Sequence, residues 1–255
     1  MIASLLCFCS LLLTDHPAGM EAGDEAFFSI DYPDAISRYE SALRVNEADP
    51  EVLWRLARVF VCTGEVAEGP ARDSLFHAAE HYARLCIRTD SSVGEGHTWL
   101  AGALGYLALD APLRDQLSLT RELLSEADRA LALNANDDAA YSIKGSCYRA
   151  LGNVGWLQRQ IASLFVGRVP PGGYREAETA LKKAIALAPL VMRHEYELAV
   201  LYIDWGREEE AEAALLHAAT LPIRTAIDRP RLEKIKKLIA ALEAARSGRS
   251  SMPTD

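Results

Sequence analysis

Two segments in the C-terminal half of the chain repeat each other at an interval of 34 residues. Three pairs of residues occupy matching places in them: Ala177 and Ala211, Leu181 and Leu215, and Ala184 and Ala218. Residues three and four apart share one face of a helix, and this face alternates small, large and small side chains. The small residues let a neighbouring helix approach closely, and the large one fills the groove between them. A repeat of this length predicts helix pairs that bury their apolar faces by stacking on one another.

A second pattern, with bulky, small and then aromatic residues, precedes these segments and recurs earlier in the chain. It is formed by Leu198, Ala199 and Tyr202, by Tyr141, Gly145 and Tyr148, by Leu53, Leu56, Ala57 and Phe60, and more weakly by His97, Leu100, Ala101 and Leu104. The first pattern also recurs, at Ala35, Tyr39 and Ala42, at Ala78, Tyr82 and Leu85, and at Leu123, Ala127 and Ala130. The chain therefore resembles the tetratricopeptide-repeat (TPR) superfamily. The resemblance implies an all-α, right-handed superhelical solenoid of about five helix-turn-helix repeats.

Four segments follow from this organisation. Residues 1–18 form an apolar leader and a candidate signal peptide, although the leader lacks a positive n-region. The solenoid occupies residues 20–222, and an inserted helix and a double-proline loop interrupt it at 154–173. Residues 223–246 form an amphipathic helix that caps the last repeat, with a membrane-surface helix as the alternative. The polar residues 247–255 form a disordered tail.

Localisation stays open between two alternatives. The protein is exported or periplasmic if the leader is a signal peptide, and it is cytoplasmic otherwise.

The inserted segment carries a narrower resemblance. A helix with the pattern Trp-x-Gln-Arg-x-Ile-Ala-x-x-Phe begins at Trp156, the run Pro-Pro-Gly-Gly at 170–173 breaks it, and Tyr174, Glu176 and Ala177 open the next helix. This arrangement is similar to the regulator of microtubule dynamics family, over roughly residues 34–245. The resemblance implies a helical binding scaffold without catalytic motifs, and it does not transfer a partner.

The charge of the chain excludes some classes of partner. With 27 basic and 36 acidic residues, the net charge is −9, which argues against a nucleic-acid binder because phosphate neutralisation needs a surplus of Lys and Arg. The same balance weakens docking on an anionic membrane, so that we expect membrane contact to be peripheral at most. A protein or peptide remains as the expected partner.

One short motif suggests a metal. Residues 77–81 read HAAEH, which matches the H-x-x-E-H signature of one class of zinc proteases. Any helix places residues four apart on one face, however, and a zinc site needs a third ligand on another element. We therefore expect His77 and His81 to be surface residues, and we expect no enzyme activity, no cofactor and no metal.

The first helices of the repeats supply the expected binding surface. We predict that a protein or peptide binds in the concave groove of the solenoid. The candidate contacts are Trp99, Tyr141, Lys144, Tyr148, Trp156, Arg159, Glu195 and Tyr202. Arg159 either points into the groove and pairs with an anion, or belongs to a helix that seals a lengthened repeat. An alternative function is the transport of a lipid or another apolar ligand in a groove closed by residues 154–173.

Overall fold

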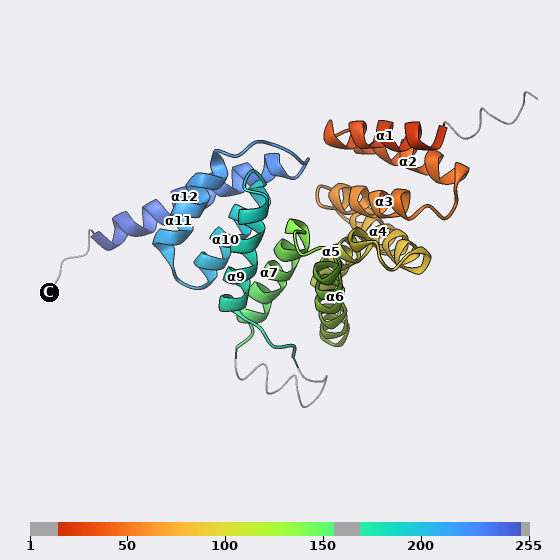
Figure 1. Ribbon diagram of the computed structural model, residues 1–255. Coiled ribbons are helices and arrows are strands. Elements are labelled where there is room, and N and C mark those ends of the chain that lie inside the picture. The colour runs from red at the N-terminus through yellow and green to blue at the C-terminus, as the bar shows by residue number, and fades with distance from the viewer. Residues whose placement is uncertain (1–14, 156–168, 251–255) are drawn as a thin grey trace, which may run out of the picture.

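The computed structural model describes residues 15–155 and 169–250, with side chains for residues 19–155 and 169–247. In this part of the chain every regular element is a helix (Figure 1). The helices are α1 (Asp15–Phe28), α2 (Tyr32–Val45), α3 (Pro50–Gly64), α4 (Pro70–Thr89), α5 (Gly94–Asp110), α6 (Leu113–Leu133), α7 (Asp138–Gly152), α9 (Tyr174–Leu187), α10 (Met192–Asp204), α11 (Glu208–Ala219) and α12 (Asp228–Ser250). The all-α prediction is confirmed.

Consecutive helices form antiparallel pairs, namely α1 with α2, α3 with α4, α5 with α6, α7 with α9, and α10 with α11. The first helices also contact one another from pair to pair, as α3 does with α5, α5 with α7, and α7 with α10. Within the described chain, the second helices make no comparable contacts with one another. They therefore lie on the outer side of the curve. The pairs wind into the predicted right-handed solenoid. The irregular repeat intervals arise because α4 has 20 residues and α6 has 21.

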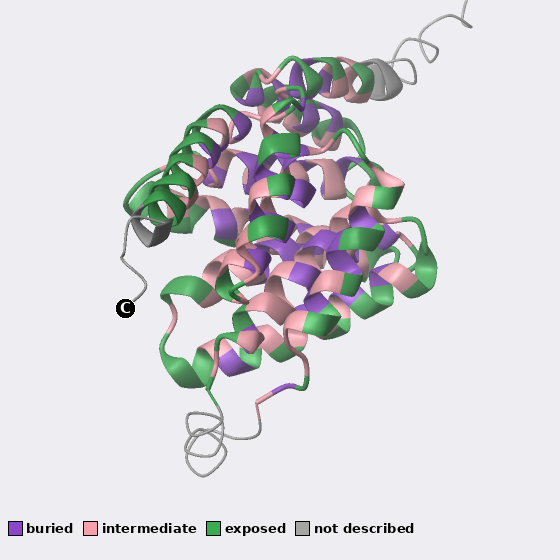
Figure 2. Cartoon of the chain, turned by 90° about the vertical axis from the view of Figure 1, so that its left-hand side faces the viewer, coloured by how far each residue is buried: buried purple, intermediate pink, exposed green. Residues whose placement is uncertain are grey.

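Alanines hold the helices close together, as the repeat predicts. Ala177, Ala184, Ala211 and Ala218 are each 0% exposed. The first helices contribute glycine at the same contacts: a Cβ on Gly145 would lie 2.6 Å from Cγ of Leu181, closer than atoms normally approach. Figure 2 shows the buried residues running through the middle of the stack, with exposed residues on its outer helices. The core is therefore a series of interfaces between neighbouring pairs.

The last pair is covered by α12. Ile235 is fully buried in a cluster with Met192 and Leu215, and the other apolar residues of the helix, Leu232, Leu238, Ile239 and Leu242, pack against this cluster. The apolar face of α12 is therefore buried against the chain itself. This burial supports the capping role and argues against the alternative of a membrane-surface helix. The helix continues to Ser250, into the segment that composition predicts as disordered. The leader up to residue 14, the helix expected at 156–168 and the last five residues lie outside the described part of the chain.

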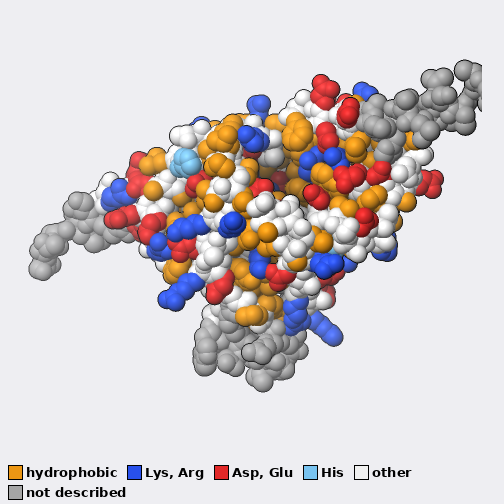
Figure 3. All heavy atoms as spheres, viewed as in Figure 1, with side chains coloured by type: hydrophobic (Ala, Val, Ile, Leu, Met, Phe, Trp, Pro, Cys, Tyr) orange, Lys and Arg blue, Asp and Glu red, His pale blue; other side chains and the backbone are white. Residues whose placement is uncertain are grey.

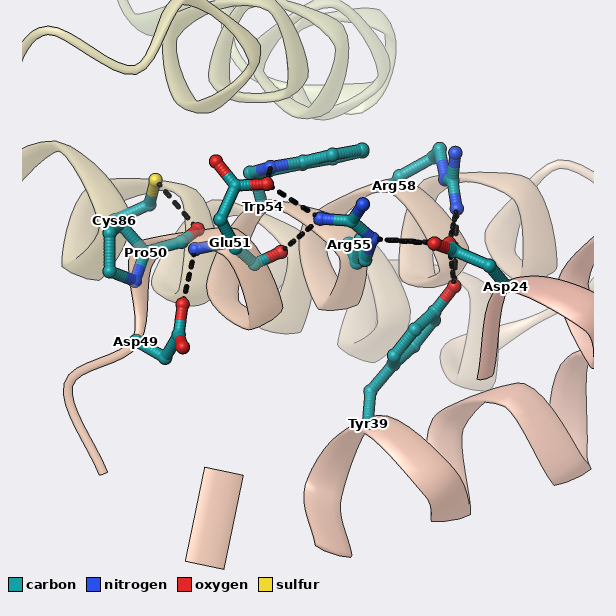
Figure 4. A network of polar contacts seen from close by, with 9 residues as sticks. All are labelled: Asp24, Tyr39, Asp49, Pro50, Glu51, Trp54, Arg55, Arg58 and Cys86. Atoms are coloured by element: carbon teal, nitrogen blue, oxygen red, sulfur yellow. Dashed lines mark hydrogen bonds and ion pairs between the residues drawn. The ribbon is translucent and has the colours of Figure 1, made fainter. Parts of the chain in front are cut away.

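A polar network joins the first pair to the second (Figure 4). The carboxylate of Asp24 in α1 accepts hydrogen bonds from Tyr39 of α2 at 2.6 Å, and from Arg55 and Arg58 of α3 at 3.0 and 2.9 Å. The Arg58 guanidinium also lies 3.7 Å from the ring centre of Phe27. Burial by itself would raise the pKa of Asp24, but the hydrogen bonds and the two arginines outweigh it and hold the pKa below its ordinary value of 3.8. This carboxylate thus links three helices in its charged form.

The repeat register predicts that Leu215→Asp destabilises the C-terminal pairs. Leu215 is fully buried, so the substitution places an uncompensated charge in the core and lowers the free energy of unfolding by about 3 kcal/mol or more. Leu216→Asp is the matched control, because the Leu216 side chain is 52% exposed. This substitution should change the free energy of unfolding by no more than about 0.5 kcal/mol. Urea titrations measure both. Equal midpoints for the two variants would contradict the register.

The Asp24 network predicts a pH-dependent contribution to stability. Asp24→Asn lowers the free energy of unfolding by about 2 kcal/mol at neutral pH, because it weakens hydrogen bonds to charged partners. Since the folded-state pKa of Asp24 lies below the unfolded value near 3.8, the stabilisation is complete above that value and is lost as the pH falls through the folded-state pKa. The difference between wild type and variant should therefore shrink in acid. Asp34→Asn, in an exposed pair with Arg38, should cost under about 0.5 kcal/mol.

Candidate functional site

The concave interior of the solenoid is crossed by contacts between its N-terminal and C-terminal helix pairs. The carboxylate of Glu65, at the end of α3, pairs with Arg193 of α10, and both contact the hydroxyl of Tyr106 in α5. The Glu65 side chain is only 3% exposed. In Figure 1 the connection from α11 to α12 reaches toward α1 and α3. Its Ala226 N–H donates a 3.0 Å hydrogen bond to the hydroxyl of Tyr32, so the two ends of the solenoid meet.

The charges in this interior are paired. Asp228 and Arg231 form an ion pair whose side chains are 5% and 7% exposed. Burial, together with the nearby Arg231, lowers the pKa of Arg193 to about 10, so that Arg193 stays charged at neutral pH. Burial also raises the pKa of the Cys62 thiol beside it. Figure 3 shows acidic and basic side chains interspersed over the surface that this view presents. Between α3 and α10 the concave wall is occupied by the chain's own side chains.

Three candidate contacts take part in packing within or between repeats. Trp99 is half-buried and packs between the clusters around Ala101 and Ala103. Glu195 is 8% exposed, and its carboxylate oxygen lies 2.8 Å from Nδ1 of His217 in α11, the other helix of the same pair. Tyr202 is 4% exposed and donates to Glu178 at 2.8 Å, under the guanidinium of Arg207. Two further candidates, Trp156 and Arg159, lie outside the described residues.

The other three candidates come together in one groove. Tyr141, Lys144 and Tyr148 project from α7 at helical spacing, and α9 supplies the opposite wall of a groove of about 470 Å³. The residues of that wall are Arg175, Glu176, Thr179, Ala180 and Lys183. None of these residues is among the candidates predicted from the sequence, which lie in first helices or in the inserted segment. Their spacing was a usable signal, because Arg175, Thr179 and Lys183 are each four residues apart and share one face of α9.

The groove opens on the outer side of the solenoid. On α7, Gly145 faces α9, whereas Ile143 and Cys147 pack on the cluster of α5 and α6. Tyr141, Lys144 and Tyr148 lie between these two faces, on the side of α7 toward the second helices α6 and α9. This placement differs from the concave wall that the sequence analysis expected. The difference arises because the concave face of α7 carries other residues, such as Arg149, which pairs with Asp204 of α10 at 2.7 Å.

The groove is cationic in an otherwise acidic chain. It contains Lys144, Arg175 and Lys183 against one carboxylate, that of Glu176. Lys144 pairs with Asp128 of α6 and lies 5.6 Å from the ring centre of Tyr148. Burial lowers its pKa, but Asp128 and Tyr148 outweigh burial and raise it above the ordinary value, so this ammonium is charged. Arg175 and Lys183 are exposed and form no ion pair within the described part of the chain.

The histidines of the HAAEH motif are surface residues. The His77 side chain is 68% exposed and lies 3.3 Å from Glu80. His81 is exposed and packs edge-on against Tyr82, with ring centres 5.4 Å apart. Over residues 15–155 and 169–250, no group of three or more His, Cys, Asp or Glu residues is arranged to hold a metal ion. In the same ranges no helix combines the length and the apolar composition needed to cross a bilayer.

A family model described as "Regulator of microtubule dynamics protein 1-3" matches residues 21–243. The chain belongs to this family. Regulator of microtubule dynamics protein 2 of Rattus norvegicus is 26% identical over 204 residues, which cover 76% of this chain and 47% of the relative. Regulator of microtubule dynamics protein 3 of Xenopus laevis is 27% identical over 193 residues, which cover 75% and 42%. The chain thus spans less than half the length of either relative.

A solved structure shows the same fold. A thermophilic TPR protein of Thermus thermophilus superposes with a TM-score of 0.64 at 23% identity, covering 86% of this chain and 98% of the other. The match supports the TPR-like fold of this family member and carries no partner over to it.

Closure of the solenoid predicts a distinctive response to Arg193→Met. The variant leaves Glu65 buried without its cation, which should lower the free energy of unfolding by about 3 kcal/mol. The radius of gyration from small-angle scattering should rise as the last pair moves away from the second. The double variant Glu65→Gln/Arg193→Met removes the uncompensated charge and should be more stable than Arg193→Met alone. Identical stability of the two variants, with an unchanged radius, would rule out the closing contact.

Proposed function

We propose that this chain is a non-enzymatic scaffold that binds a protein or peptide partner in the groove between α7 and α9. Membership of the family and the TPR-like fold support a scaffold. The observation that carries the proposal is the groove itself, because its aromatic and charged side chains come from two helices and are not buried in the core. Stacked helices fix these side chains in place, and rigid support lowers the cost of binding.

This location replaces the concave groove as the proposed binding surface. A peptide in the concave interior would have to displace Glu65 and Arg193, which already satisfy each other. Each charge would lose a partner in a desolvated position, and such a loss costs several kcal/mol. The outer groove requires no such exchange at Arg175 or Lys183.

The character of the described groove does not support the alternative function of a lipid carrier. The described groove is open and contains four acidic or basic side chains, those of Lys144, Arg175, Glu176 and Lys183. A site for an acyl chain needs mostly apolar, enclosing walls. The names of the relatives refer to microtubule dynamics, and those names describe the relatives.

A blocking substitution tests the proposal. Thr179→Trp places a large ring in the groove from an exposed position of α9. Dodecapeptides selected by phage display on the full chain should bind the wild type, and should bind Thr179→Trp at least about ten-fold more weakly by fluorescence polarisation, a loss of about 1.4 kcal/mol.

The control variant is Ala213→Trp, which adds the same ring at an exposed position of α11 and should bind the peptides as the wild type does. Circular dichroism verifies that both variants fold. The proposal fails if no peptide is enriched above background, or if the enriched peptides bind both variants equally.

A further inference from the structure

We infer that the groove between α7 and α9 recognises an extended acidic peptide segment whose two key carboxylates are four residues apart. The inference rests on the proposed function and adds the chemistry and the conformation of the ligand. Its basis is the arrangement of cations along the groove.

The two ends of the groove each combine a tyrosine with a cation. Because α7 and α9 are antiparallel, the C-terminal end of α7 lies beside the N-terminal end of α9. A Cβ on Gly152 would lie 2.4 Å from the ring of Tyr174, which fixes this register. Tyr148 and Arg175 are therefore at one end of the groove. Tyr141 and Lys183 are at the other end.

The charges at the two ends are available to a ligand. Arg175 and Lys183 are exposed and have no ion-pair partner among the described residues. Glu176 is the one acid among the described residues of the groove, and it does not compensate them fully. Its carboxylate turns back toward Gly173 at the start of α9, where a Cβ on Gly173 would lie 3.8 Å from the carboxylate oxygen. Negative charge is favoured at a helix N-terminus. Arg175 offers a planar fork that suits a carboxylate, and Lys183 offers a point charge.

The dimensions favour an extended ligand. Arg175 and Lys183 are eight residues apart on a helix, which corresponds to about 12 Å along the axis. In an extended peptide, residues i and i+4 point to the same side and lie about 13 Å apart. On a ligand helix the same distance separates residues about eight apart, so the spacing of the two acids distinguishes an extended ligand from a helical one.

The centre of the groove suits the residue between the two acids. Ala180 is buried and Thr179 is short, so the floor leaves space for the side chain at i+2. Lys144 lies at the same level, and its charge is already paired with Asp128. The rings of Tyr141 and Tyr148 provide flat walls for the peptide on either side. Specificity should therefore come from the two ends of the groove.

A spacing series tests the inference. Fluorescein-labelled peptides of one composition carry two glutamates at i and i+2, at i and i+4, or at i and i+6 in a Gly/Ser background. All three pairs lie on one side of an extended chain, so only the distance between the carboxylates changes. By fluorescence polarisation at low ionic strength, the i+4 peptide should bind at least about five-fold more tightly than the others. Its Gln analogue should bind about ten-fold more weakly.

Charge-reversed proteins give the second arm of the test. Arg175→Glu and Lys183→Glu should each weaken binding of the i+4 peptide by about ten-fold, and Lys237→Glu, an equal change at an exposed position of α12, should leave it unchanged. The double variant Arg175→Glu/Lys183→Glu should instead bind the peptide with lysines at i and i+4. Recovery of binding by opposite charges is not expected from a variant that has merely unfolded.

The outcomes separate this inference from the proposed function. If selected peptides require an open groove but show no preference for acids or for the i+4 spacing, the inference is overturned and the scaffold proposal stands. If no peptide depends on the groove, both fail. If vesicles of phosphatidylcholine and phosphatidylserine bind through Lys183 while the acidic peptides do not, the cations serve a lipid headgroup and the peptide inference is overturned.

Discussion

Each helix pair in this solenoid is apolar on two sides, and it is stable only when a neighbour covers both. The alanines at the contacts are fully buried under the neighbouring helices, so a larger side chain there would push the helices apart. The requirement is most demanding at the two ends of the stack. At the last pair, α12 covers Leu215 and Met192. At the first pair, Ala226 packs on the cluster of Phe27 and Tyr32. Both ends are thus covered by one continuous segment, the α11–α12 connection and α12 itself.

This shared cover determines the shape of the interior. Since one segment reaches both ends, the second and last pairs are held facing each other, and Glu65 and Arg193 meet. Buried ion pairs add little net stability compared with apolar contacts, but they penalise every arrangement that separates the partners. They therefore favour one curvature of the solenoid over others. The same contact occupies the surface that an open solenoid would offer to a ligand, which leaves the outer side of the helix pairs for recognition.

The sequence predicted the parts of this structure that depend on local spacing. The face formed by Ala177, Leu181 and Ala184 packs as expected, because a helix repeats its contacts at fixed intervals. Closure was not predictable in this way. Glu65 and Arg193 are far apart in the chain, and each looks like an ordinary surface charge in its own segment. Tyr141 remains a predicted ligand contact, and it lines the groove between α7 and α9 rather than the concave wall, because an aromatic residue marks an exposed face without telling which neighbours flank it.

The groove also has to be understood against the charge of the whole chain. With a net charge of −9, the protein repels an acidic partner at a distance, and salt reduces this repulsion beyond about 8–10 Å. The attraction from Arg175 and Lys183 acts only over shorter distances, inside the groove. Added salt therefore weakens two opposing effects at once, and the salt dependence of association should be shallower than two ion pairs alone would give. A partner reaches the groove through a local match in spacing rather than through long-range steering.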